Sequence, residues 1–317
     1  MSKKLGFVPA FYWHKDAAQR VASIVYGRKN MQGVEQEMRQ SMGQREARDY
    51  RQEILDSLRV AEMVLVGLGE EFDNLRNIRN AKGYAEGRDL LLDSEQSSLI
   101  PVWQQMFRET MPGETEKMRM GLQKLSACLE GKNYFVVSTA TNSEIARIPW
   151  REGRLVMPCG SDLHCQCSAA CEEHLRILQN REREHMRIKL QRWKESAFQG
   201  GAPALTEISG NCSVCGYRIM LNNIYNEKYD ENGYLADWQN YTKWLQGTLN
   251  KNIVVLELGV GMSFPSVIRF PFEKIAFYNH KAKFYRVHES LYQLTEDLAE
   301  KGLGIAKNAI DWLQNLC

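Results

Sequence analysis

The sequence predicts a doubly wound α/β fold, because three buried-strand patterns are each followed by a glycine-containing or polar loop. The strand patterns lie within 61-AEMVLVGLG-69, 133-NYFVVSTATN-142 and 252-NIVVLELGVGM-262. Such short apolar runs are typical of parallel strands that are buried on both faces. A further strand is expected at KFYRVH, residues 283–288, and a terminal helix at IAKNAIDWLQNL. In this fold class, ligands bind at the carboxyl ends of the strands.

Composition narrows the classes of partner. The chain has 317 residues, with 41 basic and 39 acidic side chains and a formal net charge of +2. The net charge is therefore too small to produce an electrostatic field that attracts nucleic acid or an anionic membrane. No apolar stretch approaches the roughly 18 residues that span a bilayer, and the N-terminus lacks a convincing cleavage site, so we expect a cytoplasmic protein. Eight cysteines in such a chain indicate metal or thiol chemistry before disulfides.

Helical spacing and composition divide the chain into three parts. Two or three amphipathic helices are expected over residues 15–60, and further helices over 93–130, 172–198 and 227–249. The predicted organisation is an N-terminal helical segment (1–54), a Rossmann-like domain (55–154 and 226–317) and a cysteine-bearing insertion (155–225).

The cysteine spacing predicts a metal site in the insertion. Cys167-x3-Cys171 and Cys212-x2-Cys215 supply four thiolates in two local pairs. Four sulfurs close a tetrahedral shell around Zn²⁺ and leave no position for substrate, so the role would be structural. Gly216 would let the backbone turn beneath the metal. The alternatives are four unrelated cysteines, or replacement of a ligand in the first pair by Cys165 or His174.

The run LELGVGMSFPSVIRFPFE, residues 256–273, resembles a motif of the macrodomain-linked, class M sirtuins. The x3 spacing of the first cysteine pair resembles that class too, and the comparison selects Cys167 as the ligand. The resemblance covers roughly residues 55–290. It implies that NAD⁺ binds between a Rossmann sheet and a zinc lobe, and that an acyl group or ADP-ribose is transferred to a protein acceptor, in some cases a lipoyl-carrier protein.

The resemblance assigns cofactor contacts to three loops. Gly67 and Gly69 match the phosphate loop, Gly259 and Gly261 match the glycines of the ELGVG loop, and His288 stands where the family has Asn. Glu70 and Glu71 follow the first loop, and each would oppose a pyrophosphate by about 1–4 kcal/mol at contact range. These carboxylates either occupy the anion position themselves, since negative charge is favoured at a helix N-terminus, or point to solvent. His288 would contact an adenosine or cap its strand.

The reaction motifs depart from the family. Ala140 and Asn142 stand where the nicotinamide and ribose loop has Asn and Asp, and only Asn142 can form a side-chain hydrogen bond. Cys159-Gly160 lies eight residues before Cys167, which is the position of the family's catalytic base. A thiol is a poor base, because its unperturbed pKa is about 8.5. Cys159 is therefore a weak base, a nucleophile, or a small residue that fills a remodelled pocket.

These observations predict a divergent sirtuin-like protein whose NAD-dependent catalysis is altered or lost. If it is active, the resemblance implies an ADP-ribosyltransferase, a deacylase or an NAD hydrolase, with Cys159 and Asn142 nearest the reacting ribose. The alternative is a non-catalytic zinc-containing scaffold that partners an active sirtuin or a carrier protein. A zinc hydrolase is excluded if four sulfurs hold the metal.

Overall fold

The computed structural model describes residues 50–316, apart from 76–77, 172–174 and 198–207. Its larger lobe contains a six-stranded, fully parallel sheet with the strand order β3-β2-β1-β7-β8-β9. The strands are β1 (Met63–Leu68), β2 (Asn133–Ser138), β3 (Leu155–Val156), β7 (Ile253–Leu258), β8 (Lys283–His288) and β9 (Gly302–Ala306). This is the Rossmann order, 3-2-1-4-5-6, and it confirms the predicted doubly wound fold.

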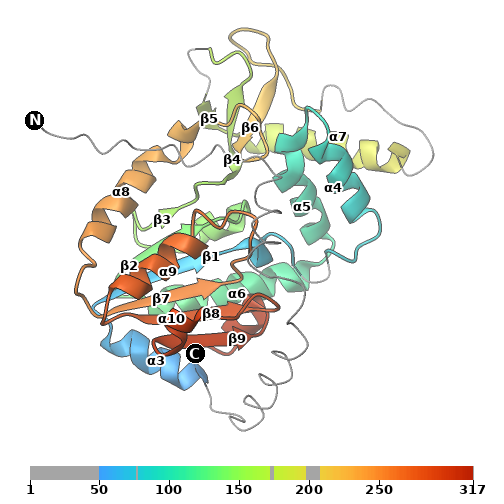
Figure 1. Ribbon diagram of the computed structural model, residues 1–317. Coiled ribbons are helices and arrows are strands. Elements are labelled where there is room, and N and C mark those ends of the chain that lie inside the picture. Colours follow the sequence, from blue (N-terminus) through green and yellow to red (C-terminus); the bar gives the residue numbers. More distant parts are fainter. Residues whose placement is uncertain (1–49, 76–77, 172–174, 198–207, 317) are drawn as a thin grey trace, which may run out of the picture.

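Helices cover both faces of the large sheet (Figure 1). One face packs on α3 (Tyr50–Val60), α6 (Pro112–Cys128) and α11 (Ala309–Leu313), the other on α8 (Leu235–Gln246), α9 (Arg269–Tyr278) and α10 (Glu296–Ala299). Alternate strand residues serve the two cores, as for Val64 and Leu65. The described part of the chain contains no helix that is long and apolar enough to cross a membrane.

The smaller lobe is built around a second sheet, which is antiparallel and has the order β5-β4-β6 (Figure 1). Its elements are β4 (Gly160–Cys167), β5 (Leu175–Ile177), β6 (Ile219–Asn223), α4 (Tyr84–Leu92), α5 (Ile100–Glu109) and α7 (Asn180–Ala197). Helix α5 packs on α7 through Trp103 and Trp193, whose ring centroids are 5.7 Å apart. The lobe therefore joins two chain segments that are far apart in the sequence.

The predicted domain boundaries differ from this arrangement in two places. Leu155–Val156 pairs with Val136–Val137 in the large sheet, so the insertion begins after residue 156 rather than at 155. Helices α4 and α5, which we assigned to the Rossmann domain, pack with the cysteine-bearing lobe instead. Of the predicted N-terminal helices, only α3 falls in the described residues, and residues 1–49 lie outside them.

The segment expected to be helical over residues 93–130 contains α5 and α6, which are separate because Pro112 starts α6 and disfavours helical geometry at Met111, which has φ −131° and ψ 61°. Two element predictions need correction. Residues 175–177, expected in a helix, form β5, and residues 305–306 belong to β9. In β9 the backbone approaches β8 so closely that a Cβ at Gly302 would lie 1.6 Å from the Phe284 oxygen.

A buried ion pair joins β7 to β8. Glu257, the acid of the ELGVG run, is the register partner of Arg286, and both side chains are almost completely buried. Arg286 donates from Nε to Glu257 Oε2 at 2.6 Å and from Nη2 to Glu273 Oε1 at 2.6 Å. The Glu of this motif thus faces α9, away from the strand ends, and its role is structural.

Replacing Arg286 should destabilise the fold strongly. Arg286→Ala leaves Glu257, at 0% exposure, without its cation, and removal of one partner from such a pair costs about 3–5 kcal/mol. Urea unfolding of the two proteins measures this difference. The control is Arg59→Ala, whose ion pair with Asp56 is exposed and is worth at most about 1 kcal/mol. Equal losses in both variants would contradict the prediction.

Candidate functional site

The four predicted cysteines come together at one end of the smaller lobe. The sulfurs of Cys167, Cys171, Cys212 and Cys215 all lie within 4.8 Å of one another. Cys167 Sγ is 3.3 Å from Cys215 Sγ, and Cys171 Sγ is 3.6 Å from Cys212 Sγ. Four thiolates bonded to one Zn²⁺ at about 2.3 Å would be about 3.8 Å apart, so the donor set and its spacing fit this ion. A zinc held by all four would have no open coordination position and would stabilise the lobe.

Two tight turns present these sulfurs. The first follows β4, where Ala170 N–H donates to the Cys167 oxygen at 3.0 Å and Ala170 has φ +48°. In the second, Gly216 N–H donates to the Cys212 oxygen at 2.9 Å, and Gly216 has φ +75°. Each turn thus needs one residue in the left-handed region, and Gly216 meets this need as expected.

Backbone amides favour the thiolate form that a metal requires. The N–H groups of Cys215 and Val214 donate to Cys212 Sγ and lower the pKa of this thiol to about 7. Burial raises the pKa of Cys167, but the amide of Ala169 and the neighbouring Cys215 sulfur outweigh it, and the net shift is downward. Cys165 is outside the cluster, and burial raises its pKa to about 11. His174 lies outside the described residues.

A second candidate site lies at the carboxyl ends of the parallel strands, between β1 and β7, where the strand order reverses. This switch point is where open α/β sheets bind ligands. Here the position is taken by Glu70, which follows β1 in the short 3₁₀ helix η1 (Glu70–Phe72). Its carboxylate accepts the N–H of Gly261 at 2.6 Å and that of Ser263 at 2.9 Å. Backbone amides that could hold a phosphate thus bind a carboxylate of the chain.

Glu71 acts in the same way one loop further along the sheet. It is 2% exposed, and it accepts the N–H of Glu289 after β8 at 2.9 Å and that of Ala309 at 2.7 Å. Burial raises the pKa of Glu71, and these two amides oppose that shift. The two neighbouring glutamates therefore tie together the loops that follow β1, β7, β8 and β9.

The glycines of these loops allow close contact between chain segments. A Cβ at Gly69 would lie 2.2 Å from the Gly259 oxygen, and one at Gly259 would lie 2.6 Å from Glu71 Cβ. A Cβ at Gly67 would lie 2.7 Å from Ile268 Cγ2 in the core beneath α9, and one at Gly261 would lie 3.0 Å from Glu70 Oε2. The described contacts of these glycines are made by the chain itself, and a cofactor role for them stays a prediction.

His288 stabilises the loop that follows β8. Its Nδ1 accepts the N–H groups of Ser290 and Leu291, each at 3.0 Å. Burial, with the charge of Arg269, lowers the pKa of His288 to about 4. The 3.5 Å approach of Nδ1 to Glu71 is therefore not an ion pair near neutral pH. The imidazole caps the strand end, as one of the two sequence interpretations held.

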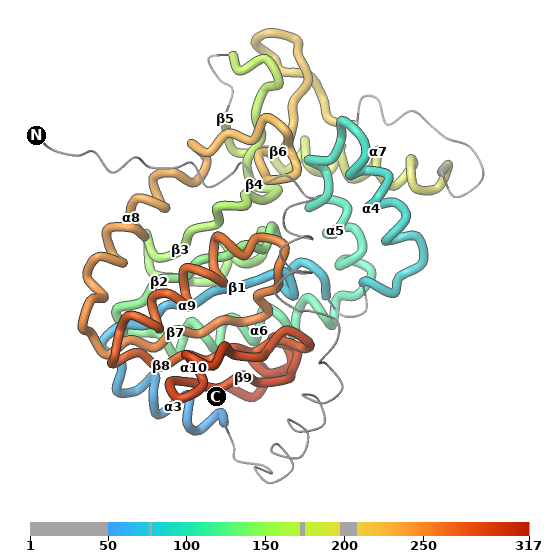
Figure 2. Tube along the Cα trace, in the orientation of Figure 1, coloured from blue at the N-terminus to red at the C-terminus, as the bar shows by residue number. Residues whose placement is uncertain are grey.

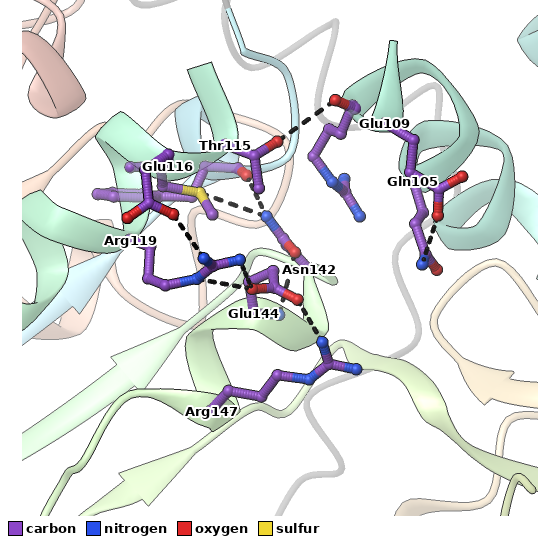
Figure 3. A network of polar contacts seen from close by, with 11 residues as sticks. Gln105, Glu109, Thr115, Glu116, Arg119, Asn142, Glu144 and Arg147 are labelled. Atoms are coloured by element: carbon purple, nitrogen blue, oxygen red, sulfur yellow. Dashed lines mark hydrogen bonds and ion pairs between the residues drawn. The ribbon is translucent and has the colours of Figure 1, made fainter. Parts of the chain in front are cut away.

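The loop after β2 carries the two residues expected near a nicotinamide ribose. Asn142 Nδ2 donates to the Phe72 oxygen at 2.9 Å and lies 3.4 Å from Met118 Sδ, while its Oδ1 accepts Glu144 N–H at 3.1 Å (Figure 3). Beside it, Glu144 binds both Arg119 and Arg147 (Figure 3). Ala140 is buried, and its N–H donates a hydrogen bond to Ser138 Oγ at 3.2 Å. Internal contacts thus use the amide of Asn142, and its catalytic role stays a prediction.

Cys159 precedes β4 at the boundary between the two lobes. Its side chain is completely buried. Burial, and then the charges of Glu70 and Asp73, raise the pKa of the thiol well above its usual value. Gly160 has φ +67° and lies so close to β6 that a Cβ would be 2.3 Å from the Asn222 oxygen, which explains the Cys-Gly pair. A raised thiol pKa lowers the fraction of thiolate, the form that acts as a base or a nucleophile, so these surroundings favour the interpretation of Cys159 as a pocket-filling residue.

Asp73 is a candidate that the sequence reasoning missed. Its two oxygens each accept Thr141 N–H at 2.9 Å, and burial raises its pKa to about 6. The nearby charge of Arg108 on α5 opposes this shift. Arg108 is itself 3% exposed, and its Nη1 has no hydrogen-bond partner among the residues that the structure describes. A buried carboxyl with a perturbed pKa is a recognised mark of functional sites, but only the folded contacts reveal this one.

Comparisons with known proteins assign no family to this chain. No profile of a known protein family matches it, and no curated protein does. Among solved structures, a Sir2 protein bound to an acetylated peptide has a TM-score of 0.49 at 12% identity, covering 84% of this chain and 96% of the other. A Sir2 homologue in complex with NAD has a TM-score of 0.48 at 11% identity, covering 84% and 91%. At these scores the likeness assigns no function, and class M membership stays a prediction.

The metal site should hold one zinc per chain. Cys212→Ser or Cys215→Ser should lose the metal and lower the midpoint of thermal unfolding, because the remaining sulfurs cannot complete the shell. Metal content by mass spectrometry and thermal unfolding check both effects. The matched control is Cys165→Ala, which removes a buried sulfur outside the cluster and should keep its zinc. Full zinc in both serine variants would refute the site.

The buried carboxyl of Asp73 should make stability depend on pH. Its pKa is about 6 in the folded chain and about 3.9 when unfolded, so the folded state binds the proton more tightly. The contribution of this group to the free energy of unfolding should therefore fall by about 3 kcal/mol in total, and most of this fall should occur as the pH rises from about 4 to about 6. Asp73→Asn should lack this slope.

Urea unfolding of the wild type and Asp73→Asn at several pH values between 4 and 7 gives the difference in their free energies of unfolding. The titration of groups common to both proteins cancels in this difference. Asp89→Asn, at an exposed carboxyl, should leave the wild-type profile unchanged. Parallel profiles for wild type and Asp73→Asn would show that Asp73 titrates normally.

Proposed function

We propose that this protein is a sirtuin-like, zinc-stabilised scaffold that has lost NAD⁺-dependent catalysis. The observation that carries the proposal is the set of four backbone N–H groups along the carboxyl edge of the sheet, two of them at the switch point, which bind Glu70 and Glu71 at 2.6, 2.9, 2.9 and 2.7 Å. Backbone N–H groups in loops that follow parallel strands commonly donate hydrogen bonds to phosphate oxygens. The two carboxylates thus take the role of the anionic ligand.

Electrostatics supports the same conclusion. A pyrophosphate at this edge would meet Glu70 and Glu71, with Asp73 close behind, and each carboxylate would oppose it by about 1–4 kcal/mol. Displacing Glu71 would also leave Glu289 N–H and Ala309 N–H without their acceptor. NAD⁺ would have to overcome both effects in order to bind.

The catalytic position supports loss of the reaction rather than a substitute chemistry. Cys159 stands where the resemblance places the base, but its raised pKa keeps it protonated. Binding is then the function left to the two lobes. We propose a protein partner, either an active sirtuin or a carrier protein.

A second candidate function is an enzyme that transfers ADP-ribose or hydrolyses NAD⁺. The pKa of Asp73, raised to about 6, favours it, because a buried carboxyl with this pKa can serve as a general base near neutral pH. This enzyme would need the loop that carries Glu70 and Glu71 to move away from the switch point.

Calorimetry with NAD⁺ and with ADP-ribose separates the two candidates. We expect no binding to the wild-type protein at millimolar ligand and no release of nicotinamide. Replacing both carboxylates in Glu70→Ala/Glu71→Ala should free the loop amides and bring ADP-ribose affinity into the millimolar range or better, a gain of at least about tenfold.

The matched control is Glu86→Ala/Glu130→Ala, which removes two exposed carboxylates outside the switch point and should gain no affinity. Glu70→Ala alone keeps the buried Glu71 and serves if the double variant unfolds. Tight binding of NAD⁺ to the wild type, with turnover that Asp73→Asn or Cys159→Ala abolishes, would overturn the proposal in favour of an enzyme.

A further inference from the structure

A pocket of about 650 Å³ lies at the amino ends of the parallel strands, on the edge of the sheet opposite the switch point. Residues at the starts of β1 and β2, the loop 151–154 and the C-terminal end of α8 line it. Figure 2 shows α8 passing beside this edge, away from the loops that follow β1 and β7. Its volume is within the usual range for small-molecule sites.

Positive charge gathers in this pocket. Six charged residues line it, namely Arg151, Arg154, Lys243, Lys251, Glu62 and Glu152. Lys251 Nζ and Glu62 Oε1 form an ion pair at 3.0 Å. For the other three cations, no ion pair with a described residue is found, and Glu152 alone remains to offset them. The lining therefore carries a formal charge of +2.

The two arginines are held close together on a fixed turn. Arg154 N–H donates to the Arg151 oxygen at 3.1 Å, and Gly153 between them has φ +66°. The turn is attached to β2, because Arg151 N–H donates to Tyr134 Oη at 2.6 Å and the Arg154 oxygen accepts Val136 N–H at 2.8 Å. These bonds hold the backbone at both arginines in place.

No ion pair to a described carboxylate is found for either arginine, and the nearby Glu152 is not among the groups that shift the pKa of Arg154. Burial and then the charge of Arg151 lower the pKa of Arg154, and Tyr134 alone acts in the opposite direction. Lys243 is explained without a ligand, because it lies in the last turn of α8, where the helix dipole favours a cation. The two guanidinium groups are not explained in this way, and like charges held together favour an anion between them.

We propose that this pocket binds a small dianion that carries phosphate groups. The charge of +2 complements a dianion, and guanidinium groups form paired hydrogen bonds to phosphate oxygens. Asn133 adds a donor, since its Oδ1 accepts Trp244 Nε1–H at 2.7 Å and its amide N–H groups are left for a ligand. The site is separate from the switch point, so the state of Glu70 and Glu71 does not affect it.

Calorimetry with inorganic pyrophosphate at low ionic strength tests the site. We expect binding to the full-length wild-type protein that weakens as salt is added. Arg154→Gln and Arg151→Gln should each weaken it by about tenfold or more, and succinate should bind more weakly than pyrophosphate. Lys228→Gln, which removes an exposed cation outside the pocket, should bind as the wild type does. Thermal unfolding verifies that each variant is folded.

Four results would overturn the proposal. The first is no detectable binding of pyrophosphate at millimolar concentration. The second is unchanged affinity in both arginine variants. The third is affinity that responds to Glu70→Ala instead, which would place the ligand at the switch point. Succinate binding as tight as that of pyrophosphate would reject the phosphate class.

Discussion

The carboxyl edge of the large sheet depends on one type of contact, in which a glutamate side chain accepts backbone amides from a neighbouring loop. Loops that follow parallel strands present N–H groups that lack partners in the sheet, and buried donors of this kind need acceptors. Glu70 and Glu71 supply these acceptors for the loops after β7, β8 and β9. These loop N–H groups therefore have acceptors without a bound anion. The same hydrogen bonds hold the loops after β7, β8 and β9 in place.

Much of the fold could be predicted because its signals are local. Short apolar runs identified β1, β2 and β7, and two short cysteine spacings identified the four cysteines that cluster in the smaller lobe. The elements that were missed lack such signals. Strand β9 reads GLGIA, where glycines that permit close backbone approach also remove the apolar pattern. The packing of α5 on α7 involves Trp103 and Trp193, two residues 90 positions apart in the sequence, and helical periodicity does not reveal which helix will be the partner.

The candidate site shows a similar limit. Motif matching located Asn142, Cys159 and His288, but their roles depend on groups that other strands bring to them. The side-chain amide of Asn142 donates a hydrogen bond to the Phe72 oxygen. The imidazole of His288 accepts hydrogen bonds from two backbone N–H groups of the loop that follows it. The role of Glu257 could in principle have been predicted from the sequence. Glu257 and Arg286 each lie within a predicted strand, and an acid and a base in neighbouring strands suggest a cross-strand ion pair. Asp73 carries no signal, because its pKa depends on burial that only the folded chain creates.

The two edges of the sheet carry different charged side chains, and this bears on the proposal that the chain keeps a binding role without NAD⁺ at its switch point. At the carboxyl edge, Glu70, Glu71 and Asp73 place negative charge where the fold normally takes phosphate. At the amino edge, Arg151 and Arg154 place positive charge beside a pocket that this fold class does not normally use. Acids that satisfy loop amides lower the affinity for anions at one edge, while arginines held on a rigid turn raise it at the other. A sheet with this charge arrangement would bind an anion at the amino edge, where donors lack partners, rather than at the switch point, where the chain has already satisfied them.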